Sequence, residues 1–366
     1  MQITVWTKMI AVILSLFSWF QIIGRGEGQP NNIPETRYAS YTLAPDQYGI
    51  WPTDEFETAT PESQHIDAER LDKQLEKANK KSGKTATDSL LVYRSGKLVY
   101  EKYFNGFDEN TPHYLASVTK SILSTLVGIA IHEGKIKGTD QTVADFFSDA
   151  VFDDARKKDI TIEHLLTMTS GIGDTELEDD DPAAWWNAAD SGKAAFEQTP
   201  LDNPPGKKFY YSGAAPHILA CALRRAVGVD LMDYANEKLF GPLGITSAAW
   251  EAAADGNYFG GGGISMTPRD MVRMGYLYLN EGRWEDKQII PVDWALQVAP
   301  KATVPYAYGR MFWNSRCQPL SGWYEMNGAN GQIIEICPSK DMVIVRTGND
   351  VCDYNYLLGG IKHWAK

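Results

Sequence analysis

A serine and a lysine three residues apart could form a nucleophile and its base. Ser117 precedes Lys120 in the stretch LASVTKSILSTLVGIAIHEGKI. On a helix, residues i and i+3 lie on one face, so the hydroxyl and the amine would point the same way. A serine hydroxyl needs a base within hydrogen-bond reach, and an amine pressed against apolar groups can lose its proton. The pair is therefore a candidate for acyl-transfer chemistry.

Apolar residues at helical spacing predict that this pair opens a long buried helix. At the start of such a helix, the free backbone N–H groups and the positive end of the helix dipole would stabilise an oxyanion beside Ser117. A Ser-x-x-Lys tetrad is expected by chance about once in a chain of this length, so the context carries more weight than the tetrad. The apolar positions are Ile122, Leu123, Leu126, Val127, Ile129, Ala130 and Ile131.

Length and composition are those of a globular enzyme. The chain has 366 residues, is 43% hydrophobic and contains 11 tryptophans, so it can bury the core of one large domain or two lobes. Its formal net charge of -12 argues against nucleic acid as a partner, because a phosphate backbone requires a basic surface.

The N-terminal sequence is typical of an export signal. Lys8 is followed by an apolar run without a charge up to residue 24, although no Ala-x-Ala cleavage site follows. An uncleaved anchor that associates with a membrane is one alternative, but the run is short for a spanning helix. A buried N-terminal helix is the other. We therefore expect residues 1–24 to be a signal peptide or membrane anchor and the protein to be periplasmic or secreted.

The rest of the chain divides into an extended segment and one large domain. Residues 25–62 are rich in Pro, Asn, Thr and Asp, which predicts a tether or a segment wrapped over a surface. Residues 63–366 then form the domain. Within it, an aspartate cap and helical spacing predict a surface helix at residues 66–78, and two β-rich runs around a turn predict a hairpin at residues 89–104.

Three further segments carry residues that could line a site. Tyr211 stands in an aromatic run just before a predicted helix, where a phenol could face a cleft, although such a tyrosine is more often part of the core. Four consecutive glycines, 260–263, predict a close backbone approach, and Thr267 predicts the start of a helix at residues 268–280. The acidic segment 172–189 could be a lid, but it is more often a solvated loop pinned by its two tryptophans.

The four cysteines show no zinc-ligand spacing. If three predicted C-terminal strands are adjacent and antiparallel, Cys317 and Cys352 fall at one end of the sheet and could form a disulfide in an oxidising compartment, while Cys337 falls at the other end. Cys221 is expected in the core face of a helix. The predicted strands are residues 308–313, 332–336 and 342–347.

Four sequence blocks occur together in an order that resembles one superfamily of hydrolases. They are SVTK, LLTMTSG, PGKKFYYSG and GGGGISMTPRDMVRMGYLYLNEGRW, closed by NGANGQ and a hairpin. Together they resemble the serine β-lactamase-like hydrolases, the superfamily of penicillin-recognising enzymes. The most similar branch holds class C β-lactamases, DD-peptidases, esterases and 6-aminohexanoate-dimer hydrolases. The resemblance extends from about residue 66 to the C-terminus.

This resemblance implies an α/β (α+β) fold in which an antiparallel sheet is flanked by helices and a helical lobe is inserted. The sheet lobe would comprise about residues 63–114 and 265–366, and the helical lobe about residues 115–264. The site would lie in the cleft where the lobes meet.

The resemblance also implies roles for individual residues. Ser117 would be the acylated nucleophile, Lys120 its base partner, and Tyr211 the proton shuttle that activates Ser117 and later the deacylating water. The oxyanion hole would be the backbone N–H groups of Ser117 and Ala329, the residue after Gly328. The substrate would be a small amide or ester, and neither a cofactor nor a metal is implied.

Two departures from the family pattern weaken a β-lactamase interpretation more than a hydrolase interpretation. Gly213 stands where the family often has an asparagine, so one polar contact to the substrate is absent. Met326-Asn327-Gly328 stands where β-lactamases have Lys or His before the glycine, and a methionine cannot hold a substrate carboxylate. We hypothesise that Arg346, on the neighbouring strand, supplies the missing cation. Gly213, Asn327, Gly328 and Arg346 are therefore the expected substrate contacts.

Other functions remain as alternatives. The protein could be a β-lactamase or DD-peptidase after all, or a penicillin-binding-like protein that binds a ligand without turnover. The intact Ser117, Lys120 and Tyr211 count against a mere binder. A metallohydrolase is disfavoured because the six histidines are scattered and no HExxH motif occurs. His113 and His164, close to the motifs, are expected to be satisfied structural residues.

Overall fold

The computed structural model describes most of the chain. The described residues are 51–81, 86–173, 184–298, 308–314, 322–349, 357, 360, 364 and 365. The predicted signal peptide at residues 1–24 and the predicted disulfide partners Cys317 and Cys352 lie outside the described residues.

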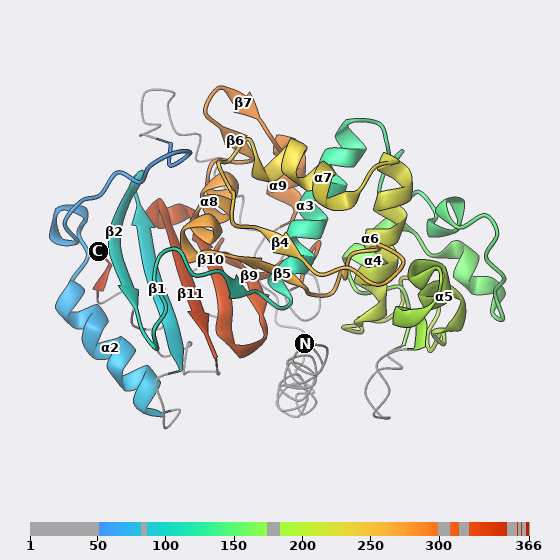
Figure 1. Cartoon of the computed structure of the whole chain (residues 1–366), viewed down its shortest axis with the longest axis horizontal. Coiled ribbons are helices and arrows are strands. Elements are labelled where there is room, and N and C mark those ends of the chain that lie inside the picture. The colour runs from blue at the N-terminus through green and yellow to red at the C-terminus, as the bar shows by residue number, and fades with distance from the viewer. Residues whose placement is uncertain are drawn as a thin grey trace, which may run out of the picture.

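An antiparallel sheet of six strands forms one side of the molecule (Figure 1). The strand order is β2-β1-β11-β10-β9-β8, so strands from the two ends of the domain pair in the middle of the sheet. The predicted sheet flanked by helices, and the predicted hairpin β1–β2, are confirmed. The strands are β1 (Thr87–Arg94), β2 (Lys97–Tyr103), β8 (Trp313–Asn314), β9 (Tyr324–Gly328), β10 (Gln332–Cys337) and β11 (Met342–Gly348).

The expected adjacency of residues 308–313 and 332–336 is wrong. β9 lies between β8 and β10, because the chain returns through Tyr324–Gly328 before it forms the hairpin β10–β11. Of the segment 308–313, only Trp313 belongs to a strand, and the rest forms a turn in which Tyr308 bridges to Trp313. The geometry from which we inferred a Cys317–Cys352 disulfide is therefore incorrect.

Helices cover both faces of the sheet. The amphipathic α2 (Ala68–Lys81) buries its apolar side against one face. The other face is covered by α8 (Pro268–Leu279), whose start is capped by Thr267 through a backbone N–H of the first turn. Gly275 lets α8 lie close to the sheet, since a Cβ at this position would come within 2.5 Å of Val343 Cγ1.

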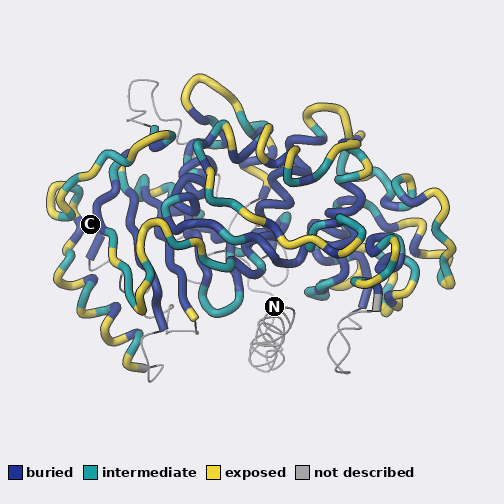
Figure 2. The backbone as a smooth tube through the Cα atoms, viewed as in Figure 1, coloured by how far each residue is buried: buried dark blue, intermediate teal, exposed yellow. Residues whose placement is uncertain are grey.

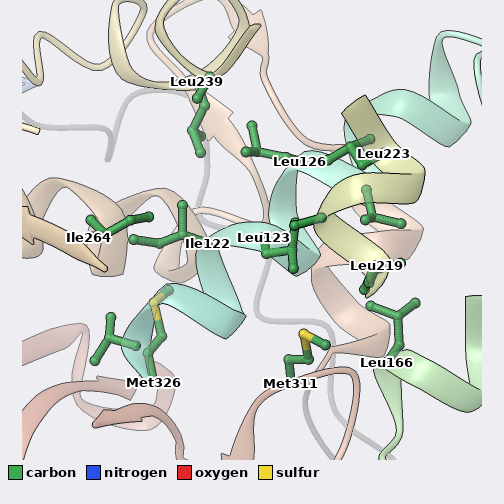
Figure 3. Close-up of a cluster of buried hydrophobic side chains, with 14 of the residues drawn as sticks. Ile122, Leu123, Leu126, Leu166, Leu219, Leu223, Leu239, Ile264, Met311 and Met326 are labelled. Atoms are coloured by element: carbon green, nitrogen blue, oxygen red, sulfur yellow. The ribbon is translucent and has the colours of Figure 1, made fainter. Parts of the chain in front are cut away.

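The helices beyond the sheet are organised around α3 (Val118–His132), which is buried along nearly its whole length (Figure 2). Figure 3 shows its apolar side chains in a common core with α6 (Ala214–Val227), which packs against it. The predicted buried helix after Ser117 is thus confirmed, as is Cys221 in the core face of α6. The remaining α-helices are α4 (Ile162–Leu166), α5 (Ser191–Gln198), α7 (Leu231–Ala235) and α9 (Val292–Gln297).

Short elements connect these parts. A three-stranded sheet of order β3-β5-β4 lies beside the start of α3, and β6 and β7 form a separate hairpin. Among the described residues, no helix has the length and apolar character needed to cross a membrane. The short strands are β3 (His113–Tyr114), β4 (Ala249–Trp250), β5 (Ile264–Met266), β6 (Arg283–Trp284) and β7 (Lys287–Gln288). Single-turn helices are η2 (Glu62–Gln64), η3 (Val143–Phe146), η4 (Ala155–Asp159), η5 (Ala184–Asn187), η6 (Asn236–Phe240), η8 (Ala329–Gly331) and η9 (Pro338–Lys340).

The described part of the N-terminal segment packs against the large domain. The Trp51 ring packs against the rings of Tyr276 and Trp284, at centroid distances of 5.4 and 5.2 Å.

The tryptophan-containing segment after residue 183 is also held by aromatic contacts. Trp185 is buried and stacks on His217 at 4.6 Å, which favours the pinned-loop interpretation over the lid for this part of the segment.

Candidate active site

Ser117 and Lys120 lie within hydrogen-bonding distance at the start of α3. Lys120 Nζ donates to Ser117 Oγ at 2.9 Å. Ser117 is the N-cap residue and is partly exposed, whereas the lysine side chain is almost fully buried. The residue before the serine, Ala116, has a left-handed backbone with φ of 47°. Such strain in a residue other than glycine is typical of functional sites, and here it adjoins the candidate nucleophile.

The glycine run provides a second partner for the lysine. Lys120 Nζ donates to the carbonyl oxygen of Gly261 at 2.6 Å. The run passes very close to other backbone, because a Cβ at Gly260 would lie 2.0 Å from the carbonyl oxygen of Pro216. The predicted close approach is therefore confirmed. Its effect is to fix the side-chain nitrogen of Lys120 between a backbone carbonyl and the serine hydroxyl.

The ring of Tyr211 lies beside the same lysine. Lys120 Nζ is 5.0 Å from the centroid of the Tyr211 ring, and Tyr211 is partly exposed. The ring packs against Trp313 at 5.6 Å and edge-on against Tyr308 at 5.9 Å. Burial, and secondly Tyr211, raise the pKa of Tyr308 well above its usual value, so Tyr308 stays neutral in this aromatic cluster. The helix α6 begins directly after Gly213, its N-cap residue.

The end of β9 approaches the backbone of the serine. A Cβ at Gly328 would lie 3.2 Å from Ser117 N and 2.2 Å from the carbonyl oxygen of Leu115, so only glycine fits there without displacement. Gly328 itself is extended, with φ of -127°. Ala329 follows immediately, so two backbone N–H groups that could bind an oxyanion come from neighbouring segments. The structure thus brings Ser117, Lys120, Tyr211 and Gly328 together.

The residues before Gly328, Met326 and Asn327, do not offer a cation. Met326 is fully buried in the core beside α3 (Figure 3). Asn327 is half-buried on the next position of the strand, and its side-chain amide donates to Glu325 Oε1 at 2.8 Å. Gly213 has no side chain to contribute. Among the expected substrate contacts, the backbone of Gly213 and of Gly328 therefore remains near the site.

The structure contradicts the expectation that Arg346 replaces the missing cation. Its side chain is completely buried. The guanidinium donates to Thr87 Oγ1 and to three backbone carbonyl oxygens, those of Ala86, Asn330 and Gly331. A buried arginine held in this way cannot meet a substrate carboxylate in solution. The prediction failed because the position of Arg346 in a strand does not show whether its side chain is exposed or buried.

The two histidines near the motifs are structural, as expected. His113 Nε2 is 2.7 Å from Oδ2 of the buried Asp88. His164 accepts the backbone N–H of Thr161 in the capping box of α4. Among the described residues, no group of three or more His, Cys, Asp or Glu side chains could hold a metal ion.

If the site hydrolyses an ester, the Gly328→Ala variant should lower kcat by about 10- to 100-fold. The added methyl group would push the end of β9 away from Ser117 N, where the oxyanion would bind. Steady-state kinetics on the folded protein would measure this loss. The matched control is Gly275→Ala, which also overpacks the core but lies on α8 against Val343 and Ile334. An equal fall of kcat in both variants would contradict a specific role of the Gly328 approach.

Comparison with known proteins agrees with this geometry. The beta-lactamase family profile matches residues 72–351. The 6-aminohexanoate-dimer hydrolase of Paenarthrobacter ureafaciens is 26% identical over 320 residues, which cover 79% of each chain.

Solved structures show the same fold. A candidate 6-aminohexanoate-dimer hydrolase from Bacillus anthracis has a TM-score of 0.68 at 22% identity and covers 87% of each chain. EstCE1, a hydrolase with promiscuous acyltransferase activity, has a TM-score of 0.67 at 17% identity and covers 81% of this chain and 99% of its own. The fold, the match over most of the chain and the serine–lysine pair at the start of α3 together show that this chain belongs to the beta-lactamase family.

Proposed function

We propose that the protein is a serine hydrolase that cleaves an amide or ester bond through an acyl-enzyme on Ser117. The observation that carries this proposal is the 2.9 Å hydrogen bond from Lys120 Nζ to Ser117 Oγ at the start of a buried helix. The nearby end of β9 supplies the second requirement, a backbone segment that can bind the oxyanion.

The chemistry follows from these positions. The Lys120–Tyr211 pair accepts the hydroxyl proton while Ser117 Oγ bonds to the substrate carbonyl carbon, and the carbonyl electrons move to oxygen. The backbone N–H groups of Ser117 and Ala329 bind this oxyanion. When the carbonyl reforms, the bond to the alcohol or amine breaks and the leaving group takes the proton. Water, activated by the same pair, then releases the acid.

The substrate is more compatible with an amide or ester than with a penicillin. Penicillins carry a carboxylate next to the β-lactam ring. In this chain the buried Met326 stands where β-lactamases have a Lys or His, and Arg346 is buried and bonded elsewhere. The relative named 6-aminohexanoate-dimer hydrolase supports an amide substrate, and EstCE1, a hydrolase with promiscuous acyltransferase activity, supports acyl-transfer chemistry. The competing function, a β-lactamase or DD-peptidase, would require a carboxylate site built from other residues.

We also propose that the protein works outside the cytoplasm, in the periplasm or after secretion. The support is the charge-free apolar run up to residue 24. Fractionation of cells producing the full chain, with N-terminal sequencing of the product, tests this localisation and shows whether the run is removed or anchors the protein.

A panel of three substrates tests the proposed function. A p-nitrophenyl ester, a 6-aminohexanoate dimer and a chromogenic cephalosporin are each incubated with the purified protein, while turnover is recorded and adducts are followed by intact mass. We expect an acyl adduct, mapped by peptide sequencing to Ser117, and turnover of the ester or the amide. Turnover of the cephalosporin alone would make the β-lactamase the better function. No adduct with any of the three would favour a non-catalytic binder.

A further inference from the structure

We propose that Arg346 is a positioning residue that fixes the oxyanion-binding turn from behind the sheet. This inference rests on the proposed hydrolase function. The turn comprises Gly328–Gly331 and includes Ala329, whose N–H would bind the oxyanion. Arg346 does not touch the substrate, and it acts through the backbone of this turn.

One side of the guanidinium holds the turn directly. Arg346 Nη1 donates to the carbonyl oxygens of Asn330 at 3.2 Å and of Gly331 at 2.7 Å. Both residues have left-handed backbone, with φ of 61° and 80°, so the turn has a conformation that needs support. A Cβ at Gly331 would lie 1.8 Å from Nη1, so glycine is what allows the guanidinium to approach.

The other side of the guanidinium is anchored in the middle of the sheet. Nε donates to Thr87 Oγ1 at 3.1 Å, and Nη2 donates to the carbonyl oxygen of Ala86 at 2.8 Å. Arg346 belongs to β11 and lies directly opposite Leu90 of β1. Both strands are paired on their two sides within the six-stranded sheet, so the turn is tied to interior strands of the sheet.

A second link keeps the turn folded when the first is weakened. Gln332 Nε2 donates to the carbonyl oxygen of Gly348 at 2.5 Å, and the Gly348 N–H donates back to Gln332 Oε1 at 3.2 Å. The turn would therefore stay in place without Arg346 but with more freedom. Gly328 packs closely against the backbone of Leu115 and Ser117. Greater movement of the turn would therefore also displace the N–H of Ala329, the next residue, which would bind the oxyanion.

The expected effect is on the transition state more than on substrate binding. Loss of a complete oxyanion donor costs about 100- to 1,000-fold in kcat in other hydrolases. A donor that is loosened should cost less, about 10-fold, with KM changed less than about twofold, because the ground-state ester does not use the oxyanion hole fully.

The experiment compares Arg346→Met and Arg346→Lys with the parent. Two quantities are measured on folded protein, namely kcat and KM for the p-nitrophenyl ester and the inhibition constant of a trifluoromethyl ketone, which forms an oxyanion on the serine. The matched control is Arg273→Met, another buried arginine that donates to backbone carbonyls, those of Pro52 and Thr53, but lies on α8.

We expect Arg346→Met to lower kcat and to weaken ketone binding by the same factor of about 10. Arg346→Lys should recover part of both losses, and Arg273→Met should change neither quantity. Unchanged kcat and ketone affinity in folded Arg346→Met, with only a lower melting temperature, would show that the arginine is a structural brace and overturn the inference.

If Arg346→Met does not fold, a milder pair of variants tests whether Arg346 positions the turn. Thr87→Val removes the acceptor of Arg346 Nε, whereas Thr87→Ser keeps it. We expect the valine variant to lose kcat and ketone affinity together and the serine variant to keep both, and equal values in the two variants would overturn the inference. An inactive parent protein would instead show that the proposed hydrolase function itself is wrong.

Discussion

The Ser117→Ala variant is expected to lose at least about 10,000-fold in kcat/KM for an ester and to form no adduct with a fluorophosphonate. The hydroxyl oxygen is the atom that would bond to the substrate carbonyl carbon, and alanine has no such atom. Burst kinetics and intact mass on parent and variant measure both losses. The control is Ser121→Ala, one turn further along α3, whose hydroxyl donates to the Met311 carbonyl oxygen at 2.6 Å in the core.

The control separates chemistry from folding. Ser121→Ala should lose some stability because a buried carbonyl oxygen loses its donor, but it should keep the labelling rate and turnover per folded molecule. If Ser117→Ala were labelled as fast as the parent, the nucleophile would be another residue and the acyl-enzyme mechanism at this site would be abandoned.

The Lys120→Met variant is expected to lose about 1,000-fold in kcat/KM while it stays folded. Methionine fills a similar volume and is compatible with burial, but it can neither hydrogen-bond to Ser117 Oγ nor accept its proton. The rate of labelling by the fluorophosphonate should fall in parallel, because the hydroxyl would no longer be activated. Stopped-flow labelling and the melting temperature, recorded together, measure the two effects.

Lys157→Met is the matched control for that variant. Lys157 is also buried and also donates to a backbone carbonyl, that of Glu197 at 2.6 Å, but it lies in η4. Its loss should lower stability without changing the labelling rate. A Lys120→Met protein that labels at the parental rate would leave Tyr211, and not the lysine, as the general base.

Local sequence signals predicted most of the elements that carry the site. The start of α3 at Ser117, the hairpin β1–β2 and the capped helix α8 follow from patterns that span few residues, namely helical periodicity, a turn between two β-rich runs, and a Thr-Pro cap. Such patterns depend on residues that are close in the sequence, so they can be recognised without knowing how the rest of the chain packs.

The parts that failed depend on contacts between distant segments. Nothing near Arg346 in the sequence shows that its partners would be Ala86 and the turn at Asn330, and its charge suggested an exposed binding residue. The position of β9 between β8 and β10 was missed for the same reason, because the packing of whole strands decides their order in the sheet. The left-handed backbone of Ala116 had no local signal either, because alanine does not favour it.

The pairing of β1 with β11 has a consequence for how the chain is made. Ser89 and Thr347, which share a buried hydrogen bond of 2.7 Å across this pair, are 258 positions apart in the sequence. At a synthesis rate of about 5–20 residues per second, the first hairpin must wait on the order of ten to fifty seconds for its neighbour to leave the ribosome. During that interval one edge of β1 is open to pairing with other chains, so newly made protein should depend on chaperones that shield strand edges.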